Sequence, residues 1–228
     1  KNKSSIYKYF FIQKAEKELY RVYFLLLKQN AIRDYCFAEC NKLIKVSIPH
    51  TIKSIEKCAF YECSSLTEVF IPSSVTSIGP HSFRECSSLA KIVIPSSVTS
   101  IEKHAFDGCT SLERIIIPTS ITKIGVCAFY GCSSLEFVSI PYSIKFIVSH
   151  AFVGCTKLKS IFIPSLIDSI GQSSFRECKS LNEIIFEKPF SITTIGKGSF
   201  CDCTSLTHLS IPSSVTSIGK DAFKGCSS

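Results

Sequence analysis

The residues of this chain that could do chemistry are its 13 cysteines and the histidines that share their periodicity. A thiolate can act as a nucleophile or bind a metal, and a neutral imidazole is a common metal ligand. A fixed period of about 20 to 50 residues is the sequence signature of a solenoid, so most of these cysteines are expected to form one column of a repeat array. Nine of them recur every 23 residues, with one step of 25: Cys40, Cys63, Cys86, Cys109, Cys132, Cys155, Cys178, Cys203 and Cys226.

Disulfides could join cysteines on neighbouring rungs, because the Cα atoms there lie near the separation that the bond tolerates. The periodicity favours free thiols instead. Cysteines of one column point in the same direction into the same core, the total is odd, and each occupies a position that needs a small apolar residue. We therefore expect a column of buried, unreactive thiols. Four cysteines lie outside this column: Cys36, Cys58, Cys127 and Cys201.

A second column contains zinc-type donors, at the position two residues before a repeated phenylalanine. Its members in successive units are Cys58, His81, His104, Cys127 and His150. Zinc prefers four ligands in a tetrahedron, whereas a linear column offers two or three neighbours. The alternative is a half-exposed position at the start of a helical turn that tolerates many residues. We predict no metal and no cofactor, and keep metal binding by this Cys/His column as the minor alternative.

The repeated serines and glycines do not form a recognisable active site. Serine pairs such as Ser64 and Ser65 are typical of turns, and the sequence contains neither a Gly-rich phosphate loop nor Gly-x-Ser-x-Gly. The carboxylates are scattered rather than paired in register. The sequence therefore predicts that this chain is not an enzyme.

The elements that would position these residues follow from the rest of the unit. A phenylalanine precedes each column cysteine by three residues, and a leucine follows it by three wherever the unit continues. Next comes apolar-x-apolar-Pro, as in Val69, Ile71 and Pro72, a period-two pattern that predicts one short strand per unit, ended by proline. The Ala-Phe-x-x-Cys segment predicts one or two turns of helix or 3-10 structure. Stacked units would give an α/β solenoid with a parallel sheet.

The unit from Leu89 to Cys109 reads Leu-x-x-Ile-x-Ile-Pro-x-x-Val-x-x-Ile-x-x-x-Ala-Phe-x-x-Cys. This pattern closely resembles the BspA-like, treponemal-type leucine-rich repeat, and the resemblance covers residues 36–228. It implies a curved solenoid with the parallel sheet on its concave face and short helical or 3-10 turns on its convex face. It also implies a non-catalytic recognition surface. Members of the family are best known as surface proteins of bacteria and protists that adhere to matrix proteins or to other cells.

Residues 1–35 depart from this array, and we predict that they form a divergent, basic N-terminal cap on a solenoid of residues 36–228. Ile32 can be aligned with Ile55, and Tyr23 with Val46. Residues 1–30 carry five of the eight net positive charges, seven Lys or Arg against two Glu. The repeats are thus nearly neutral, which argues against nucleic-acid binding. No apolar run is long enough to span a membrane. The array stops where the next leucine should follow Ser228, so we expect more chain or a partner there.

The strongest candidate site is the outward face of the predicted strands. We use the name apolar stripe for six outward residues that are large and apolar, with Lys91 and Arg114 at its edge. An exposed apolar patch of this kind marks a protein-binding site, although β-branched and aromatic residues also favour strands for structural reasons alone. The stripe consists of Phe70, Val93, Ile116, Phe137, Phe162 and Ile185.

Two functional classes follow from these observations. One is a non-enzymatic scaffold that binds a protein partner, such as a larger assembly or a filament, through its concave face; free thiols favour a cytoplasmic or cytoskeletal location for it. The other is a cell-surface adhesin that binds extracellular matrix, a host protein or other cells, as the family resemblance implies. The ends of the full-length protein would distinguish them, because a signal peptide or an anchor indicates the adhesin.

Overall fold

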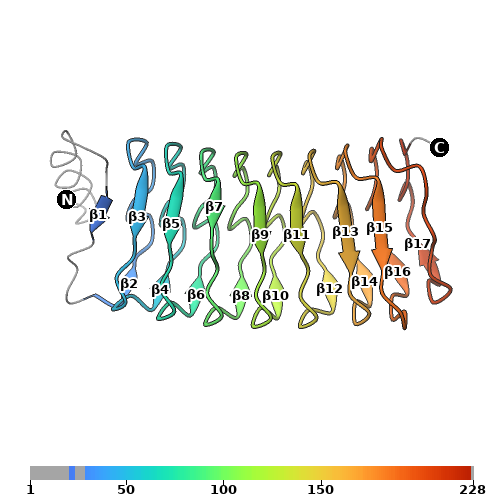
Figure 1. Cartoon of the computed structure of the whole chain (residues 1–228), viewed down its shortest axis with the longest axis horizontal. Coiled ribbons are helices and arrows are strands. Elements are labelled where there is room, and N and C mark those ends of the chain that lie inside the picture. Colours follow the sequence, from blue (N-terminus) through green and yellow to red (C-terminus); the bar gives the residue numbers. More distant parts are fainter. Residues whose placement is uncertain (1–20, 24–28, 227–228) are drawn as a thin grey trace.

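The computed structural model describes residues 21–23 and 29–226, which stack as successive rungs of a parallel β-solenoid along one long axis (Figure 1). The colours follow the sequence in order from one end of the array to the other, so successive rungs of the chain lie side by side. This arrangement is required by the unit itself, because a single 23-residue rung cannot bury its own apolar side chains.

The apolar-x-apolar-Pro segments form the first column of strands, as predicted. In β5 the middle residue Val69 is buried, while Phe70 beside it points outward. Neighbouring strands pair in parallel with their valines in register, as Val46 with Val69. The strands of this column are β1 (Arg21–Tyr23), β3 (Lys45–Ser47), β5 (Glu68–Phe70), β7 (Lys91–Ile92), β9 (Arg114–Ile116), β11 (Phe137–Ser139), β13 (Ser160–Ile163) and β15 (Glu183–Phe186).

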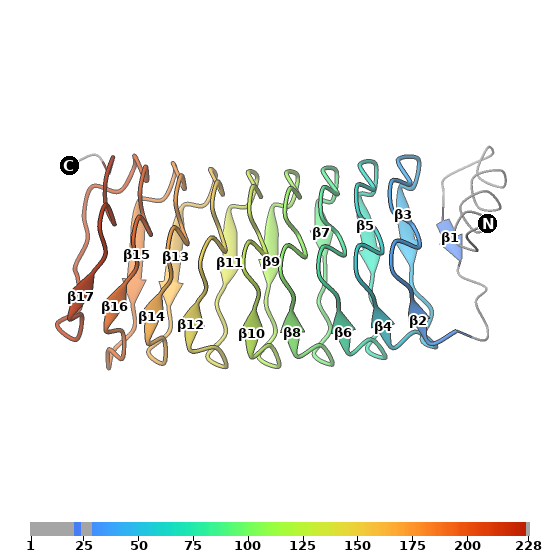
Figure 2. The ribbon, with the colours of Figure 1, turned by 180° about the vertical axis from the view of Figure 1, so that it is seen from behind.

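The prediction of one strand per unit was wrong, because each rung also contributes a two-residue strand to a second column (Figure 2). The inward residues here, such as Ile52 and Ile55, are three apart, which hid the extended backbone from a search for period two. Ile55 pairs in register with Ile78. The second column comprises β2 (Ala31–Ile32), β4 (Ser54–Ile55), β6 (Ser77–Ile78), β8 (Ser100–Ile101), β10 (Lys123–Ile124), β12 (Phe146–Ile147), β14 (Ser169–Ile170), β16 (Thr194–Ile195) and β17 (Ser217–Ile218).

The Ala-Phe-x-x-Cys segments form hydrogen-bonded turns, and the expected helical or 3-10 turns are not found in the part of the chain that the structure describes. The residues two before and two after each phenylalanine have positive φ, for example 56° at His81 and 60° at Glu85. A right-handed helix cannot continue through such residues. The backbone N–H groups instead alternate: Phe83 donates to Ala105 of the next rung at 2.9 Å, and Arg84 donates back to His81 at 3.3 Å.

The column cysteines are donors within the core, and all 13 cysteines of the chain are free thiols. The thiol of Cys109 is fully buried and donates to the carbonyl oxygen of Phe83, one rung back, at 3.2 Å. The same bond recurs from Cys63 to Cys226. Burial raises the pKa of the column thiols from Cys86 to Cys226, to about 12 for Cys203, so these thiols remain protonated.

The repeated phenylalanines fill the core behind this thiol column. From Phe37 to Phe223 each ring stacks on the next, with centroids 5.2 to 5.6 Å apart and planes within 12°. Those from Phe60 to Phe200 are fully buried. Stacked rings and aligned aliphatic columns therefore hold the strand faces in fixed register along the array.

The array begins before the first column cysteine. Strand β1 pairs with β3, and Ile32 pairs with Ile55 as expected. The alignment of Tyr23 with Val46 was wrong by one residue, because Val22 pairs with Val46 and Tyr23 pairs with Ser47. Residues 1–20, which carry most of the basic charge assigned to the cap, lie outside the described residues.

Candidate protein-binding surface

All six residues of the apolar stripe are exposed on the outward face of the first strand column, where the alternation of the strands places them. Val93 and Ile116 are 75% and 72% exposed, and Phe70 is 59% exposed. Phe137, Phe162 and Ile185 are also exposed. Their immediate neighbours in the strands, such as Val69 and Ile115, are buried. The stripe therefore lies over a rigid, close-packed base.

Strand register shows how the stripe runs from rung to rung. Phe162 and Ile185 are directly paired on β13 and β15. On β9 and β11 the pairs are Ile116 with Ser139 and Arg114 with Phe137. The stripe thus shifts at Phe137 from one outward column of the sheet to the other, which lies two residues earlier on the strand.

Only some of the charged residues at the edge of the stripe form ion pairs with other described residues. Lys45 and Glu68, on neighbouring strands, form an ion pair of 3.0 Å. Lys91 and Arg114 continue the same outward column on β7 and β9, and both are exposed. Neither forms an ion pair with another described residue, and Glu113, the residue before Arg114, lies beyond ion-pair distance of both.

The Cys/His column lies on the turns, at the positive-φ position that precedes each Ala-Phe or Ser-Phe pair. The rings of His81 and His104 stack with centroids 4.7 Å apart. His104 Nδ1 lies 2.9 Å from a carboxylate oxygen of Asp107, which Arg84 also approaches to 3.1 Å. Burial, followed by the charges of His104, Arg84 and Lys103, lowers the pKa of His81.

This geometry does not suit a metal ion. Parallel stacked rings direct their nitrogen lone pairs alongside one another rather than toward a common point. Among the described residues no group of three His, Cys, Asp or Glu side chains is arranged to hold a metal. The minor alternative of metal binding therefore has no donor set in this part of the chain, and we do not propose it.

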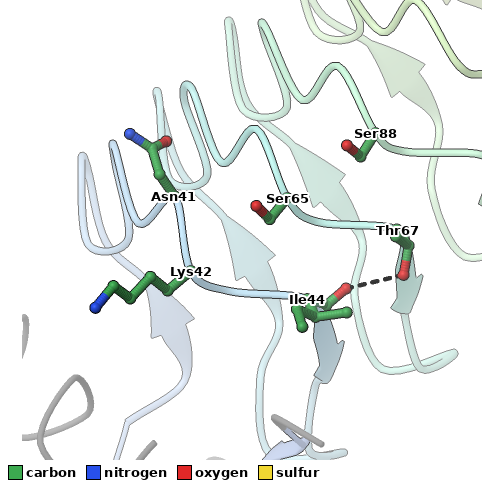
Figure 3. Close-up of a pocket in the computed structure, with 6 residues that line it drawn as sticks. All are labelled: Asn41, Lys42, Ile44, Ser65, Thr67 and Ser88. Atoms are coloured by element: carbon green, nitrogen blue, oxygen red, sulfur yellow. Dashed lines mark hydrogen bonds between the residues drawn. The ribbon is translucent and has the colours of Figure 1, made fainter. Parts of the chain in front are cut away.

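A shallow open depression of about 460 Å³ lies on the segments that connect the cysteine turns to the first strand column (Figure 3). Its lining is mainly polar. The Thr67 hydroxyl is used within the fold, since it donates to the carbonyl oxygen of Ile44 at 3.1 Å. Open depressions of this kind do not enclose a small molecule. The lining residues are Asn41, Lys42, Ile44, Ser65, Thr67 and Ser88.

The two-residue insertion at Glu187 to Phe190 connects three rungs, whereas the sequence indicated only a bulge in the exit loop of one rung. One carboxylate oxygen of Glu187 accepts a hydrogen bond from the Tyr142 hydroxyl at 2.6 Å, and the other accepts one from the Ser165 backbone N–H at 2.9 Å. The bond from Tyr142 is the main reason that the pKa of Glu187 is lowered. The only sequence signal was the 25-residue step between Cys178 and Cys203.

A few large apolar residues outside the stripe are also exposed, and the sequence analysis did not single them out. Tyr142, Phe146 and Leu166 are examples. The exposure of Phe146 could have been predicted from the sequence, because this residue occupies a position that is serine in β4, β6, β8, β14 and β17.

Stacked parallel strands, a proline after most first strands and columns of buried leucines define a leucine-rich repeat solenoid. The family model described as "BspA type Leucine rich repeat region" matches residues 30–158 and 100–228, with 6 copies. The chain belongs to this family, and the resemblance seen in the sequence is confirmed.

Solved leucine-rich repeat structures show the same architecture. A protein from Bacteroides ovatus is 29% identical, with a TM-score of 0.67, over 86% of this chain and 68% of its own. The T. pallidum leucine-rich repeat protein is 27% identical, with a TM-score of 0.59, over 77% and 71%. A leucine-rich cell surface protein of Faecalibacterium prausnitzii is 30% identical, with a TM-score of 0.52, over 86% and 68%.

Comparison with the curated proteins finds no match. Within residues 21–23 and 29–226, no helix has both the length and the hydropathy that a membrane span requires.

Proposed function

We propose that this chain is a non-enzymatic scaffold that binds a protein partner through the apolar stripe. The observation that carries the proposal is the exposure of six large apolar side chains on one strand face. A patch of this kind, edged by Lys91 and Arg114, has the composition of a protein interface, with an apolar centre and a polar rim.

The fold does not require large apolar residues at these positions. Ser47 and Ser139 occupy the same outward column as Phe70 and Ile116, and the rungs that carry them pair in the same register. A preference of β-branched and aromatic residues for strands would act equally on these rungs. The large apolar residues at some rungs, against serine at others, are therefore better explained by binding than by a requirement of the fold.

The test replaces Phe70 and Phe162 by serine in one variant. Phe146→Ser is the matched control, since Phe146 is 54% exposed on the second strand column and outside the stripe. Both proteins are used to capture partners from the native source, which are identified by mass spectrometry, and their thermal unfolding is compared. We expect the double variant to lose a partner that the control retains, at similar stability. Unchanged binding by the double variant would contradict the proposal.

A surface adhesin is the second candidate, and one observation favours it. The Faecalibacterium prausnitzii structure, 30% identical over most of this chain, is described as a leucine-rich cell surface protein. The same face would then contact matrix proteins or other cells. Surface labelling of intact cells with an antibody against the chain separates the two candidates, because a cytoplasmic or cytoskeletal scaffold would be labelled only after permeabilisation.

The domain organisation belongs to the same proposal. Residues 1–35 would form a basic cap on the first rungs, and residues 36–228 would present the concave binding face. The pairing of β1 with β3 supports continuity between cap and array. If the cap is structural, removal of residues 1–20 should lower the unfolding temperature without changing the partner that is captured.

A further inference from the structure

Two cations that have no ion-pair partner among the described residues lie beside the most exposed part of the apolar stripe. Lys91 and Arg114 begin β7 and β9, at equivalent positions of successive rungs whose strands are in contact. Like charges at neighbouring exposed positions repel each other. Glu68 could screen Lys91, but its carboxylate forms the 3.0 Å ion pair with Lys45 on the other side. Lys91 and Arg114 therefore lack a carboxylate partner among the described residues, and a ligand with carboxylates would neutralise their charges.

The apolar residues beside these cations are the most exposed of the stripe. Ile116 follows Arg114 by two residues on β9, and Val93 follows Lys91 by two residues, directly after the end of β7; all four side chains are exposed. A complementary surface must present apolar side chains flanked by carboxylates. Glu136, an acid on the rung after Arg114, forms an ion pair with Lys159 at 3.2 Å and does not pair with these cations.

The spacing of the stripe indicates the shape of the partner. From Phe70 to Ile185 the stripe crosses five rung steps, which is about 24 Å at about 4.8 Å per step. An α-helix rises about 1.5 Å per residue, so about 16 residues cover that length. One rung then corresponds to about three residues, which matches the i, i+3, i+4, i+7 face of an amphipathic helix. In an extended segment, residues on one face are about 6.6 Å apart, and this distance does not match the spacing of the rungs, which is about 4.8 Å.

We propose, building on the protein-binding function above, that the stripe receives an acidic amphipathic helix of about 16 residues lying along the solenoid axis. Its apolar face covers the stripe from Phe70 to Ile185. Glutamates or aspartates on one flank contact Lys91 and Arg114. The pairing of charges sets the direction and position of the helix, and the apolar contacts supply most of the affinity.

The probe is a synthetic 18-residue helix with leucines at i, i+3, i+4 and i+7 and glutamates on the flanks, labelled for fluorescence anisotropy. A second peptide replaces each glutamate by lysine, and a third carries a central proline that breaks the helix. The protein is tested as the full chain and as the double variant Lys91→Glu with Arg114→Glu. Lys145→Glu with Lys220→Glu makes the same change of net charge at exposed positions outside the stripe.

We expect the glutamate helix to bind the full chain about tenfold or more tighter than the lysine helix. The Lys91 and Arg114 double variant should reverse this preference, and the control variant should retain it. The proline peptide should bind at least tenfold more weakly than the intact glutamate helix.

The proposal is overturned if the two helices bind equally, if the proline peptide binds as well as the intact helix, or if no peptide binds. None of these results touches the broader function, which depends on capture of a native partner by the stripe. If the Phe70 and Phe162 variant keeps its native partner, the function itself fails, whatever the peptides do.

Discussion

The column of stacked phenylalanines should make the stability of the array depend on position. Phe106 is fully buried between Phe83 and Phe129, with ring centroids 5.6 and 5.5 Å away. Phe223 is half-buried and stacks on Phe200 at 5.5 Å. Replacement of either residue by leucine keeps an apolar side chain and removes the ring. Phe106→Leu loses two ring contacts and Phe223→Leu loses one.

The expected magnitudes follow from these contacts. An aromatic pair contributes about 0.5 to 1.5 kcal/mol beyond its buried area, so Phe106→Leu loses about 1 to 3 kcal/mol from stacking. The smaller side chain adds about 0.5 to 1 kcal/mol for lost contacts in a core that cannot fully close. The total is about 1.5 to 4 kcal/mol for Phe106→Leu. Phe223→Leu should cost about 0.5 to 1.5 kcal/mol, since one contact is lost at a partly solvated site.

The assay is urea unfolding followed by far-UV circular dichroism and by tyrosine fluorescence, since the chain contains no tryptophan. Free energies of unfolding are compared only where the slope of the transition is unchanged. Agreement between the two probes checks that the array unfolds cooperatively. Equal losses for the two variants, or a loss under 1 kcal/mol for Phe106→Leu, would refute the view that stacked rings stabilise the column.

Three further predictions test the close approach of rungs and the buried ionisable groups. Gly125→Ala should lower the free energy of unfolding in urea by about 3 kcal/mol, because the new Cβ would overlap the backbone of Lys103. Gly131→Ala, at a residue with φ of 67° and no close neighbour, should lower it by about 1 kcal/mol. Equal losses for the two variants would exclude the overlap as the cause. The six column thiols from Cys86 to Cys203 should react with Ellman's reagent at pH 8 only after addition of denaturant, and stability should fall as the pH rises above about 8.5, since folding raises their pKa and thiols ionise first in the unfolded chain; rapid reaction of these thiols in the native protein would contradict their burial. The pKa of His81 is lowered in the fold, so its contribution to stability is present above about pH 6.5 and is lost as the pH falls below that value toward the lowered pKa; His81→Gln should flatten the dependence of the melting temperature on pH between 7 and 5, and an unchanged slope would contradict the assignment to His81.

Much of the fold was predictable because the repeat multiplies a weak local signal. A single Val-x-Ile-Pro segment is ambiguous, but eight aligned copies identify a strand and the direction of each side chain. The outward residues Phe70, Val93 and Ile116 were found in this way, and their exposure agrees with the prediction. The second strand column was not predicted because its inward residues are three apart, a spacing that does not distinguish a strand from a helix.

The turn segments show where local pattern fails. Ala-Phe-x-x-Cys has apolar residues at helix-like spacing, but two positive-φ residues per rung interrupt any helix. Histidine, cysteine and glutamate rarely adopt that conformation unless tertiary contacts impose it. Here the next rung imposes it, since the N–H of His81 donates to Lys103 and that of Glu85 to Asp107 across the gap. A prediction made from one unit alone cannot include a bond that exists only between units.

The sequence by itself determined the period, the family, the first strand column and the outward positions, because all of these repeat every rung and depend only on which residues are apolar. Only the tertiary structure decided what the repeated polar and sulfur-bearing residues do. The cysteine column donates hydrogen bonds to phenylalanine carbonyls, His81 stacks on His104, and Lys91 and Arg114 form no ion pair with any residue that the structure describes. These outcomes depend on atoms that are 23 or more residues apart in the chain and a few ångströms apart in space, and the stacking of rungs alone brings them together.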